Sequence, residues 1–330
     1  MTAETSQPAN ARVAAVVIGR NEGARLTACL ESLDGETARV VYVDSGSTDG
    51  SIERARQAGA EVVALDPARP FTAARARNAG LAALGADAPA FVQLIDGDCV
   101  LQPGWIATGM ATLDARPDVA VVCGRRREAH PEVSVYNRLC DIEWRGPAGE
   151  VRACGGDALA RVAALRAVDG FDEALIAGEE PDLCVRLRAN GWRIHRLDAE
   201  MTLHDAAMTR FAQWWQRNRR AGHAFAEGAA RHGAPPERHW VREARRALAW
   251  GAGLPVAIAL AALIQPWALT AVALYPLQVV RLAVREGPAR RAAWEWAAFT
   301  VLGKFAEAAG ALGYHAGRLR GRRKGLIEYR

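Results

Sequence analysis

Short apolar runs alternate with helical patterns from Val13 to Cys123, and few folds accommodate that order. Each apolar run is long enough for one buried strand, and turn residues such as Gly59 and Gly85 close the helical stretches. The predicted strands are Val13–Ile18, Val40–Val43, Glu61–Leu65, Phe91–Ile95 and Val119–Cys123, and the predicted helices run through Leu26–Leu33, Ser51–Ala58 and Thr72–Leu84. This alternation predicts an α/β fold with a mostly parallel sheet and helices on both of its faces.

The second half of the chain has weaker periodicity and then a change of composition. After Gly124, the clearest elements are a helix over Pro181–Ala189 and a strand over Arg193–Arg196. From the 330 residues we predict a disordered N-terminus over residues 1–11, an α/β domain over 12–235 and a helical, membrane-associated region over 236–330.

Charge and cysteine usage narrow the possible functions. The formal net charge is +5. Its excess lies mostly in the C-terminal third and favours a basic surface facing a membrane over a nucleic-acid groove, because no base-reading motif accompanies it. The six cysteines include no C-x-x-C pair, which indicates reduced thiols in a cytosolic compartment. Residues 1–10 lack an apolar core, so we predict no cleaved signal peptide and an N-terminal domain that stays in the cytoplasm.

The C-terminal third contains a long uncharged segment, Ala247–Val280. A run of about 34 residues is too long for one transmembrane helix of roughly 20 residues and suffices for two short spans. Pro266 marks the expected hairpin turn, and arginines flank the run at both ends. The positive-inside rule then places both flanks on the cytoplasmic side of the inner membrane. The alternatives are a buried Ala-rich hairpin of a soluble domain and a hairpin that dips into one leaflet.

An amphipathic helix is predicted over residues 292–318, because Trp294, Val301, Phe305 and Leu312 recur at helical spacing. Its apolar face suits the membrane interface, with the basic tail after Arg318 against anionic lipid. The alternative is a helix that packs on the catalytic domain or on a second subunit.

Two carboxylates stand at the end of the predicted strand Phe91–Ile95. Asp96 and Asp98 flank Gly97, and ligands of open α/β sheets bind where strands end. Residues two apart in an extended segment point the same way, about 6.5 Å apart, so both side chains can share one hydrated Mg²⁺ or Mn²⁺. Such a cation can neutralise a departing diphosphate. The same three residues also suit an ordinary turn.

Two further polar stretches allow both a functional and a structural interpretation. Asp44 ends the strand Val40–Val43, where it can accept from a base N–H or cap the turn that follows. Arg125-Arg126-Arg127 can meet a phosphate-bearing acceptor, although a solvated charge run is the more frequent use of adjacent arginines.

Six short motifs occur in a fixed order. They are Val17–Glu22, Val43–Gly50, Ala76–Gly80, Asp96–Asp98, Gly170–Asp172 and Gly178–Leu183. Together they resemble the inverting family 2 glycosyltransferases with the GT-A fold, over roughly Ala11–Ala230. The resemblance implies transfer of a sugar from a nucleotide-diphosphate donor, with a UDP-sugar favoured, at a Mg²⁺ or Mn²⁺ site.

The resemblance also implies roles for individual residues. The implied nucleotide-binding residues are Asn21, Glu22, Asp44, Arg77 and Asp96; the implied metal ligands are Asp98, Asp96 and His204; and the implied catalytic base is Glu180. Asp44 matches the position that recognises the base, commonly uracil. Asp98 matches the acidic residue that is usually the direct metal ligand. For His204, a satisfied structural histidine is the alternative.

The position of Glu180 also has a physical rationale of its own. Pro181 at the first helical position puts Glu180 at the N-cap, where the helix dipole favours its ionised form. A fixed carboxylate can then take the proton of an acceptor hydroxyl. The alternative is that the carboxylates of Glu179, Glu180 and Asp182 only decorate a helix N-terminus.

We therefore expect a membrane-associated enzyme that transfers a sugar to a hydroxyl of a lipid-linked or polysaccharide acceptor. A nucleotide-sugar, the acceptor and membrane lipid are its expected partners, and nucleic acid is not. Two other classes remain open: a sugar-1-phosphate nucleotidyltransferase, which would need a better Gly-rich loop than Gly19–Gly23, and a non-catalytic membrane scaffold that keeps the fold.

Overall fold

The computed structural model describes residues 9–321, in two compact units. The first unit consists of the chain up to Ala129 together with Trp144–Ala206, and the second of His130–Glu143 together with the chain from Ala207. Residues 1–8 of the predicted disordered N-terminus lie outside the described residues, whereas Ala9–Arg12 form a short 3₁₀ helix, η1.

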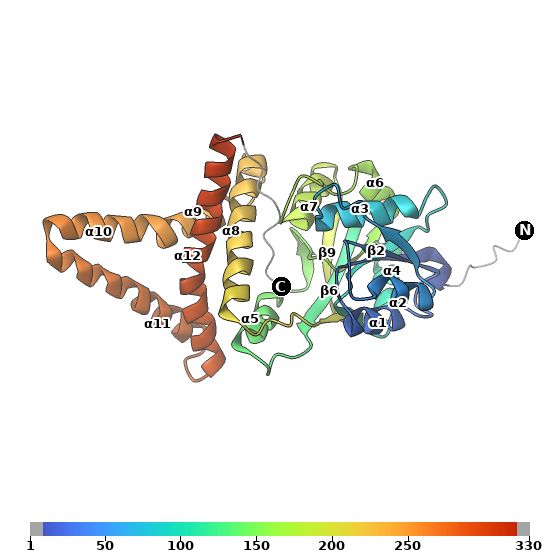
Figure 1. Cartoon of the computed structure of the whole chain (residues 1–330), viewed down its shortest axis with the longest axis horizontal. Coiled ribbons are helices and arrows are strands. Elements are labelled where there is room, and N and C mark those ends of the chain that lie inside the picture. Colours follow the sequence, from blue (N-terminus) through green and yellow to red (C-terminus); the bar gives the residue numbers. More distant parts are fainter. Residues whose placement is uncertain (1–8, 322–330) are drawn as a thin grey trace, which may run out of the picture. The chain divides into compact units, whose positions relative to one another are not determined.

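The first unit is built on a nine-stranded sheet (Figure 1). Its strands are β1 (Val13–Gly19), β2 (Arg39–Asp44), β3 (Glu61–Ala64), β4 (Phe91–Asp96), β5 (Cys99–Leu101), β6 (Val119–Glu128), β7 (Gly149–Val151), β8 (Ala158–Arg161) and β9 (Arg193–His204). Their order is β3-β2-β1-β4-β8-β6-β9-β5, and β7 pairs with β9. The strand predicted over Arg193–Arg196 thus continues to His204.

The prediction of an α/β sheet is confirmed, and the sheet is mixed. Strands β3, β2, β1 and β4 are parallel to one another, and β6 is parallel to β9. β8 then runs antiparallel to both β4 and β6, and β5 and β7 run antiparallel to β9. Residues that follow β8 therefore leave the sheet at the edge opposite to the ends of β1, β2 and β4.

Helices cover both faces of the sheet, as the burial of its central strands requires. All six residues of Val13–Ile18 are buried, whereas a strand with one solvated face would alternate. The helices of this unit are α1 (Ala24–Glu31), α2 (Ser51–Gln57), α3 (Ala73–Ala83), α4 (Trp105–Ala115), α6 (Val162–Ala167) and α7 (Glu179–Ala189). Gly80 of α3 packs so closely on β1 that a Cβ there would lie 2.3 Å from Cγ1 of Val16.

The second unit is helical. It contains α5 (Val135–Glu143), α8 (Phe211–His232), α9 (Val241–Leu248), the π-helical turn η2 (Ala249–Gly253), α10 (Leu254–Ile264), the 3₁₀ helix η3 (Pro266–Ala273), α11 (Leu274–Glu286) and α12 (Arg291–Leu319). α12 matches the helix predicted over 292–318 and packs along α8 (Figure 1). Glycines permit the close approach: a Cβ on Gly222 or Gly310 would lie 1.9 Å from a backbone oxygen of the facing helix.

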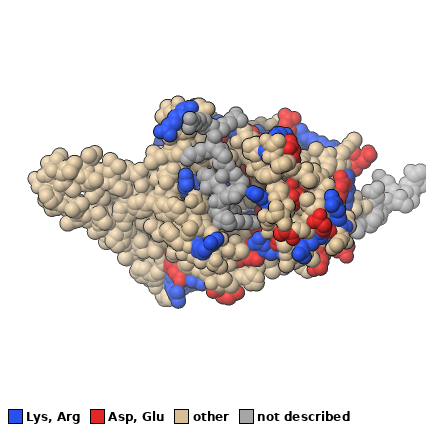
Figure 2. Space-filling view, in the orientation of Figure 1, with Lys and Arg blue, Asp and Glu red and all other residues tan. Residues whose placement is uncertain are grey.

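Two helical segments among the described residues are long and apolar enough to cross a membrane. They are Val241–Ile264, with a mean hydropathy of 2.1, and Pro266–Glu286, with a mean hydropathy of 1.5, and they turn at Gln265 as predicted. The most apolar window of each is only 11% and 6% buried, and Leu263 and Ile264 are more than four-fifths exposed. Such exposure does not suit the buried hairpin of a soluble monomer. The outer part of this hairpin carries no charged residue on the face that Figure 2 shows.

Candidate active site

The site residues gather where β1, β2 and β4 end. Register pairs Ile18 of β1 with Asp96 and Gly19 with Asp44, so both acidic residues close parallel strands at one edge of the sheet. The chain turns at Gly97 and Asp98 before β5 begins, so the segment is not extended there. Asp96 and Asp98 therefore do not follow the spacing of an extended segment; they lie in two groups of possible metal ligands that share Cys99.

Asp44 organises the turn after β2. Its Oδ2 accepts hydrogen bonds from the backbone N–H groups of Gly46 at 2.9 Å and Ser47 at 2.8 Å, and its Oδ1 accepts from the Tyr42 hydroxyl at 3.0 Å. Only 1% of Asp44 is exposed. Asp44 therefore caps the turn that follows β2. The second lone pair of Oδ1 can still accept a hydrogen bond from a ligand.

Asn21 and Glu22 fix the loop between β1 and α1. Asn21, at a left-handed φ of 56°, accepts from the Thr48 N–H at 2.7 Å, and its own N–H donates to the Ser47 hydroxyl at 2.9 Å. Glu22 is buried and forms an ion pair with Arg25 at 2.7 Å. The two bonds of Asn21 join the loops after β1 and β2, and the Ser47 N–H connects this pair of loops to Asp44.

The buried guanidinium of Arg77 contacts three carboxylates. The residue is 2% exposed on α3, and its guanidinium lies 2.9 Å from Asp96, 2.9 Å from Glu180 and 3.3 Å from Glu179. Burying one guanidinium against three acids is favourable only where charge and hydrogen bonds compensate for lost hydration. Arg77 thus ties the end of β4 to the start of α7.

The neighbouring motif residues hold α7 in that position. The Asn78 side chain accepts from the Phe171 N–H at 2.8 Å and donates to the Phe171 carbonyl at 2.8 Å, and the Arg77 guanidinium lies 5.5 Å from the centre of the Phe171 ring. Gly170 precedes this contact at φ +65°, with its missing Cβ against Asn78. The motifs Ala76–Gly80 and Gly170–Asp172 therefore form one structural unit that places Glu180.

Glu180 differs from its prediction in two respects. α7 begins at Glu179 with Gly178 as N-cap at φ 80°, so Glu180 is the second helical residue and not the N-cap. A glycine in the left-handed region starts the helix two residues before the proline. Burial and the neighbouring charge of Glu179 raise the pKa of Glu180 to about 7, against the opposing effect of Arg77. Burial and repulsion thus outweigh the helix dipole, which was expected to favour the ionised form.

Sequence reasoning missed Arg126 and Asp157. Arg125 and Arg127 have half-exposed side chains, whereas only 15% of the Arg126 side chain is exposed. Arg126 lies 2.7 Å from Asp157 and 3.2 Å from Asp96. Burial disfavours the charge of Asp157, but the ion pair with Arg126 outweighs it and lowers the pKa of Asp157 to about 2. The alternation of a strand over the three arginines was the signal that could have found Arg126.

Gly156 covers the carboxylate cluster with backbone alone. A Cβ at this position would lie 2.5 Å from Nη2 of Arg77, 2.9 Å from Oδ2 of Asp96 and 3.2 Å from Oε1 of Glu180. A side chain at this position would therefore have to displace the ends of these charged side chains.

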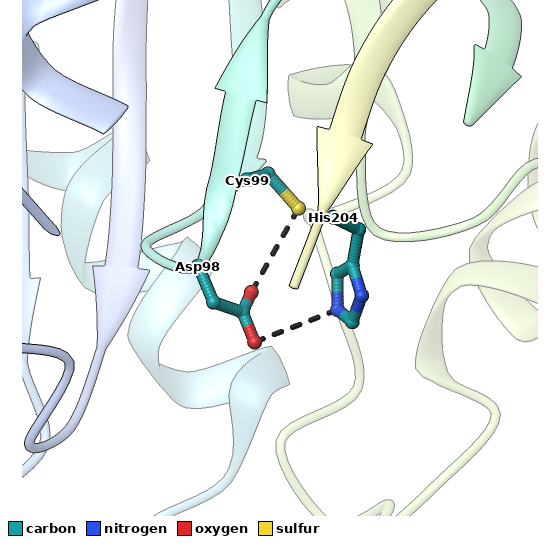
Figure 3. Close-up of side chains that lie close together, drawn as sticks. All are labelled: Asp98, Cys99 and His204. Carbon is teal, nitrogen blue, oxygen red and sulfur yellow. Dashed lines mark hydrogen bonds and ion pairs between the residues drawn. The ribbon is translucent and has the colours of Figure 1, made fainter. Parts of the chain in front are cut away.

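Asp98 and His204 meet in the second cluster, as the resemblance implies. Nε2 of His204 lies 3.5 Å from Oδ2 of Asp98, and Sγ of Cys99 lies 3.7 Å from Oδ1 of Asp98 (Figure 3). The three ligand atoms all lie within 4.8 Å of one another. Carboxylate oxygen, imidazole nitrogen and thiol sulfur at this spacing fit a divalent cation, which Asp98 and His204 would hold.

Comparison with known proteins finds glycosyltransferases. Residues 15–151 match the family model Glycosyl transferase family 2. The chain is 30% identical over 242 residues to the Pre-mycofactocin glycosyltransferase of Mycobacterium tuberculosis, which covers 69% of this chain and 49% of that protein. It is 29% identical over 211 residues to the Succinoglycan biosynthesis protein ExoA of Rhizobium meliloti, which covers 59% of this chain and 64% of that protein. The chain thus spans about half to two thirds of these relatives.

A solved structure shares the fold over most of the chain. The mannosyltransferase PcManGT of Pyrobaculum calidifontis, in complex with GDP-Man and Mn²⁺, superposes with a TM-score of 0.62. The match covers 91% of this chain and 87% of that one at 21% identity. The likeness extends beyond the residues that the family model matches and confirms the GT-A-type fold.

Proposed function

We propose that this chain, which carries a family 2 glycosyl transferase domain, is a metal-dependent inverting glycosyltransferase. Its substrates are a nucleotide-diphosphate sugar and an acceptor hydroxyl. The observation that carries the proposal is that the Arg77 guanidinium contacts both Glu180 and Asp96. Asp98, two residues after Asp96, pairs with His204. A proton acceptor and a diphosphate-binding centre thereby stand at one end of one sheet.

The chemistry assigned to Glu180 is general-base catalysis. The acceptor oxygen attacks the anomeric carbon, its proton passes to the Glu180 carboxylate, and the bond from that carbon to the diphosphate oxygen breaks with its electron pair. Attack opposite to the leaving group inverts the configuration. A pKa of about 7 suits this role, because a base is most effective when its pKa lies near the operating pH.

Two neighbouring carboxylates are less suited to the same role. The Glu179 side chain is 5% exposed, against 17% for Glu180, and it lies deeper beside Arg77. Asp182 is engaged by Arg186 one helical turn later, at 2.8 Å. Glu180 is therefore the carboxylate of this turn that an acceptor hydroxyl can reach.

The donor side is assigned to the loops after β1, β2 and β4. Asp44 accepts from the base, and Asn21 and Glu22 line the nucleotide. Asp98 and His204 hold Mg²⁺ or Mn²⁺, which when bound neutralises charge on the departing diphosphate. Arg77 and Arg126 keep Asp96 in place, so that this carboxylate faces the nucleotide from a fixed position.

The acceptor is assigned from attachment to a membrane. The two apolar helical segments are long enough to anchor the chain in the inner membrane, and the arginines at both ends of the hairpin favour a cytoplasmic catalytic unit. An enzyme anchored in this way meets lipid-linked or growing polysaccharide acceptors. The relative named for succinoglycan biosynthesis is consistent with this class.

A donor panel with detergent-solubilised full-length protein tests the proposal. UDP- and GDP-sugars are supplied with Mn²⁺ or EDTA, and released nucleoside diphosphate is measured. We expect release that EDTA abolishes, and a loss of about 10² to 10⁴ in rate for Glu180→Gln with donor binding retained. Asp182→Asn is the matched control. Pyrophosphate release would instead favour a sugar-1-phosphate nucleotidyltransferase, and donor binding without any turnover would favour a scaffold.

A further inference from the structure

We propose that Cys99 is a third ligand of the divalent cation, and that its sulfur makes the site select Co²⁺ or Zn²⁺ over Mg²⁺. The inference rests on the proposed metal-dependent function and concerns the ligand set of the same site. Its basis is the cluster of Asp98, Cys99 and His204 (Figure 3). Magnesium prefers oxygen ligands, whereas a thiolate favours softer transition metals.

The register of two strands places Cys99 beside His204. β5 and β9 are antiparallel, and Cys99 and His204 are direct cross-strand partners. Side chains of such partners project from the same face, with Cβ atoms about 4.5 to 5.5 Å apart. The backbone N–H of Asp205 donates to the Asp98 carbonyl at 3.0 Å and extends this pairing to Asp98. The backbone therefore holds all three ligands in position before any ion binds.

The three ligand atoms are close enough to share one ion, since they all lie within 4.8 Å of one another. Metal bonds of about 2.0 to 2.3 Å to oxygen, nitrogen and sulfur, at tetrahedral angles, put ligand atoms about 3.3 to 3.7 Å apart. Nε2 of His204 lies 3.5 Å from Oδ2 of Asp98, and Sγ of Cys99 lies 3.7 Å from Oδ1, so the two neighbours approach different oxygens of one carboxylate. A fourth position remains for water or a diphosphate oxygen.

A competing cluster uses the same sulfur. Cys99 also lies near Asp96 and Asp157, and those three ligand atoms lie within 4.8 Å of one another. Arg126 forms ion pairs with both of these carboxylates, and Arg77 forms one with Asp96. A cation there would have to displace buried guanidinium groups, so the cluster with the imidazole is the favoured site.

Two charged side chains border the imidazole and the sulfur. Nδ1 of His204 lies 3.9 Å from the buried carboxylate of Glu128, too far for a hydrogen bond, while Nε2 lies 3.5 Å from Asp98. Burial and the carboxylates of Asp157, Asp98 and Asp96 raise the pKa of Cys99, with Arg126 at 3.9 Å as the opposing charge, so the bound cation itself would have to displace the thiol proton.

Cobalt spectroscopy tests the proposal without relying on turnover. Co²⁺ is titrated into metal-free full-length protein in detergent, and absorption is recorded in the visible and near-ultraviolet ranges. We expect tetrahedral ligand-field bands together with a thiolate-to-cobalt charge-transfer band. Cys99→Ser should lose the charge-transfer band and bind Co²⁺ at least about tenfold more weakly, with little change in Mg²⁺ affinity. Cys123→Ser, which removes a buried thiol outside both clusters, should keep the band.

The spectrum of the wild-type protein can by itself overturn the proposal. The test therefore remains decisive even if Cys99→Ser fails to fold. Ligand-field bands without a charge-transfer band would mean that Asp98 and His204 bind the ion without Cys99, and the metal-dependent function would stand. A charge-transfer band that Cys99→Ser retains would assign the sulfur to another cysteine. No binding of Co²⁺ or Mn²⁺ to the wild type would refute the metal site itself.

Discussion

The charge of Glu179 should set the pH at which the enzyme becomes active. Glu179 and Glu180 both contact Nη1 of Arg77, at 3.3 and 2.9 Å, so the two contacting oxygens are no more than about 6 Å apart. At an effective dielectric constant of about 20, two unit charges at that distance repel by about 3 kcal/mol, or about two pKa units. Glu179→Gln removes this repulsion and keeps an oxygen that accepts from Arg77. It should lower the pKa of Glu180 by one to two units, allowing for partial solvent screening.

The assay is kcat/KM of nucleoside diphosphate release from about pH 5 to pH 9. A general base works in its ionised form, so the wild-type kcat/KM should rise with pH through about 7 and then level off. The rise for Glu179→Gln should occur at lower pH, and the variant should exceed the wild type in relative activity below pH 6.

Asp182→Asn is the control, because its carboxylate lies on the same helical turn and pairs with Arg186 at 2.8 Å. Its profile should follow that of the wild type. An unchanged profile for Glu179→Gln, or a rise displaced to higher pH, would refute the electrostatic account of Glu180. A wild-type profile without any inflection near pH 7 would remove Glu180 as the base.

Three other outcomes are expected. Asp98→Ala should keep the fold, lose Mn²⁺ binding and abolish turnover; near-normal transfer by this variant in EDTA would contradict the metal assignment. Gly156→Ala should lower the free energy of unfolding by about 1 to 3 kcal/mol and impair turnover, because its Cβ would lie 2.5 Å from Nη2 of Arg77. An unchanged melting temperature and an unchanged rate would show that the loop accommodates the methyl group without cost. Full-length protein should resist high salt and alkaline carbonate and dissolve in detergent, and a reporter after Arg330 should report the cytoplasm while one at Pro266 reports the far side. Extraction by salt alone would exclude the hairpin as a membrane anchor.

The sequence by itself determined the order of the elements and the division of charge along the chain. Apolar runs and helical spacing are local properties, so β1, β4 and α3 lie within a residue or two of their predicted bounds. The break at Pro266 is equally local, because proline and its preceding residue interrupt a helix wherever they stand. The resemblance of six ordered motifs then indicated which acidic residues to consider together.

The tertiary structure alone decided which of those residues meet. Arg77 contacts Glu180 across about a hundred residues of chain, and Arg126 contacts Asp157 through the pairing of β6, β8 and β9. Spacing in the sequence could not separate Asp96 from Asp98, because a turn at Gly97 sends them to different clusters. It could not give the pKa of Glu180 either, since burial and a neighbouring carboxylate arise only when α7 packs beside Arg77. Local periodicity fixes backbone conformation, whereas burial, charge neighbours and cross-strand register depend on contacts between distant parts of the chain.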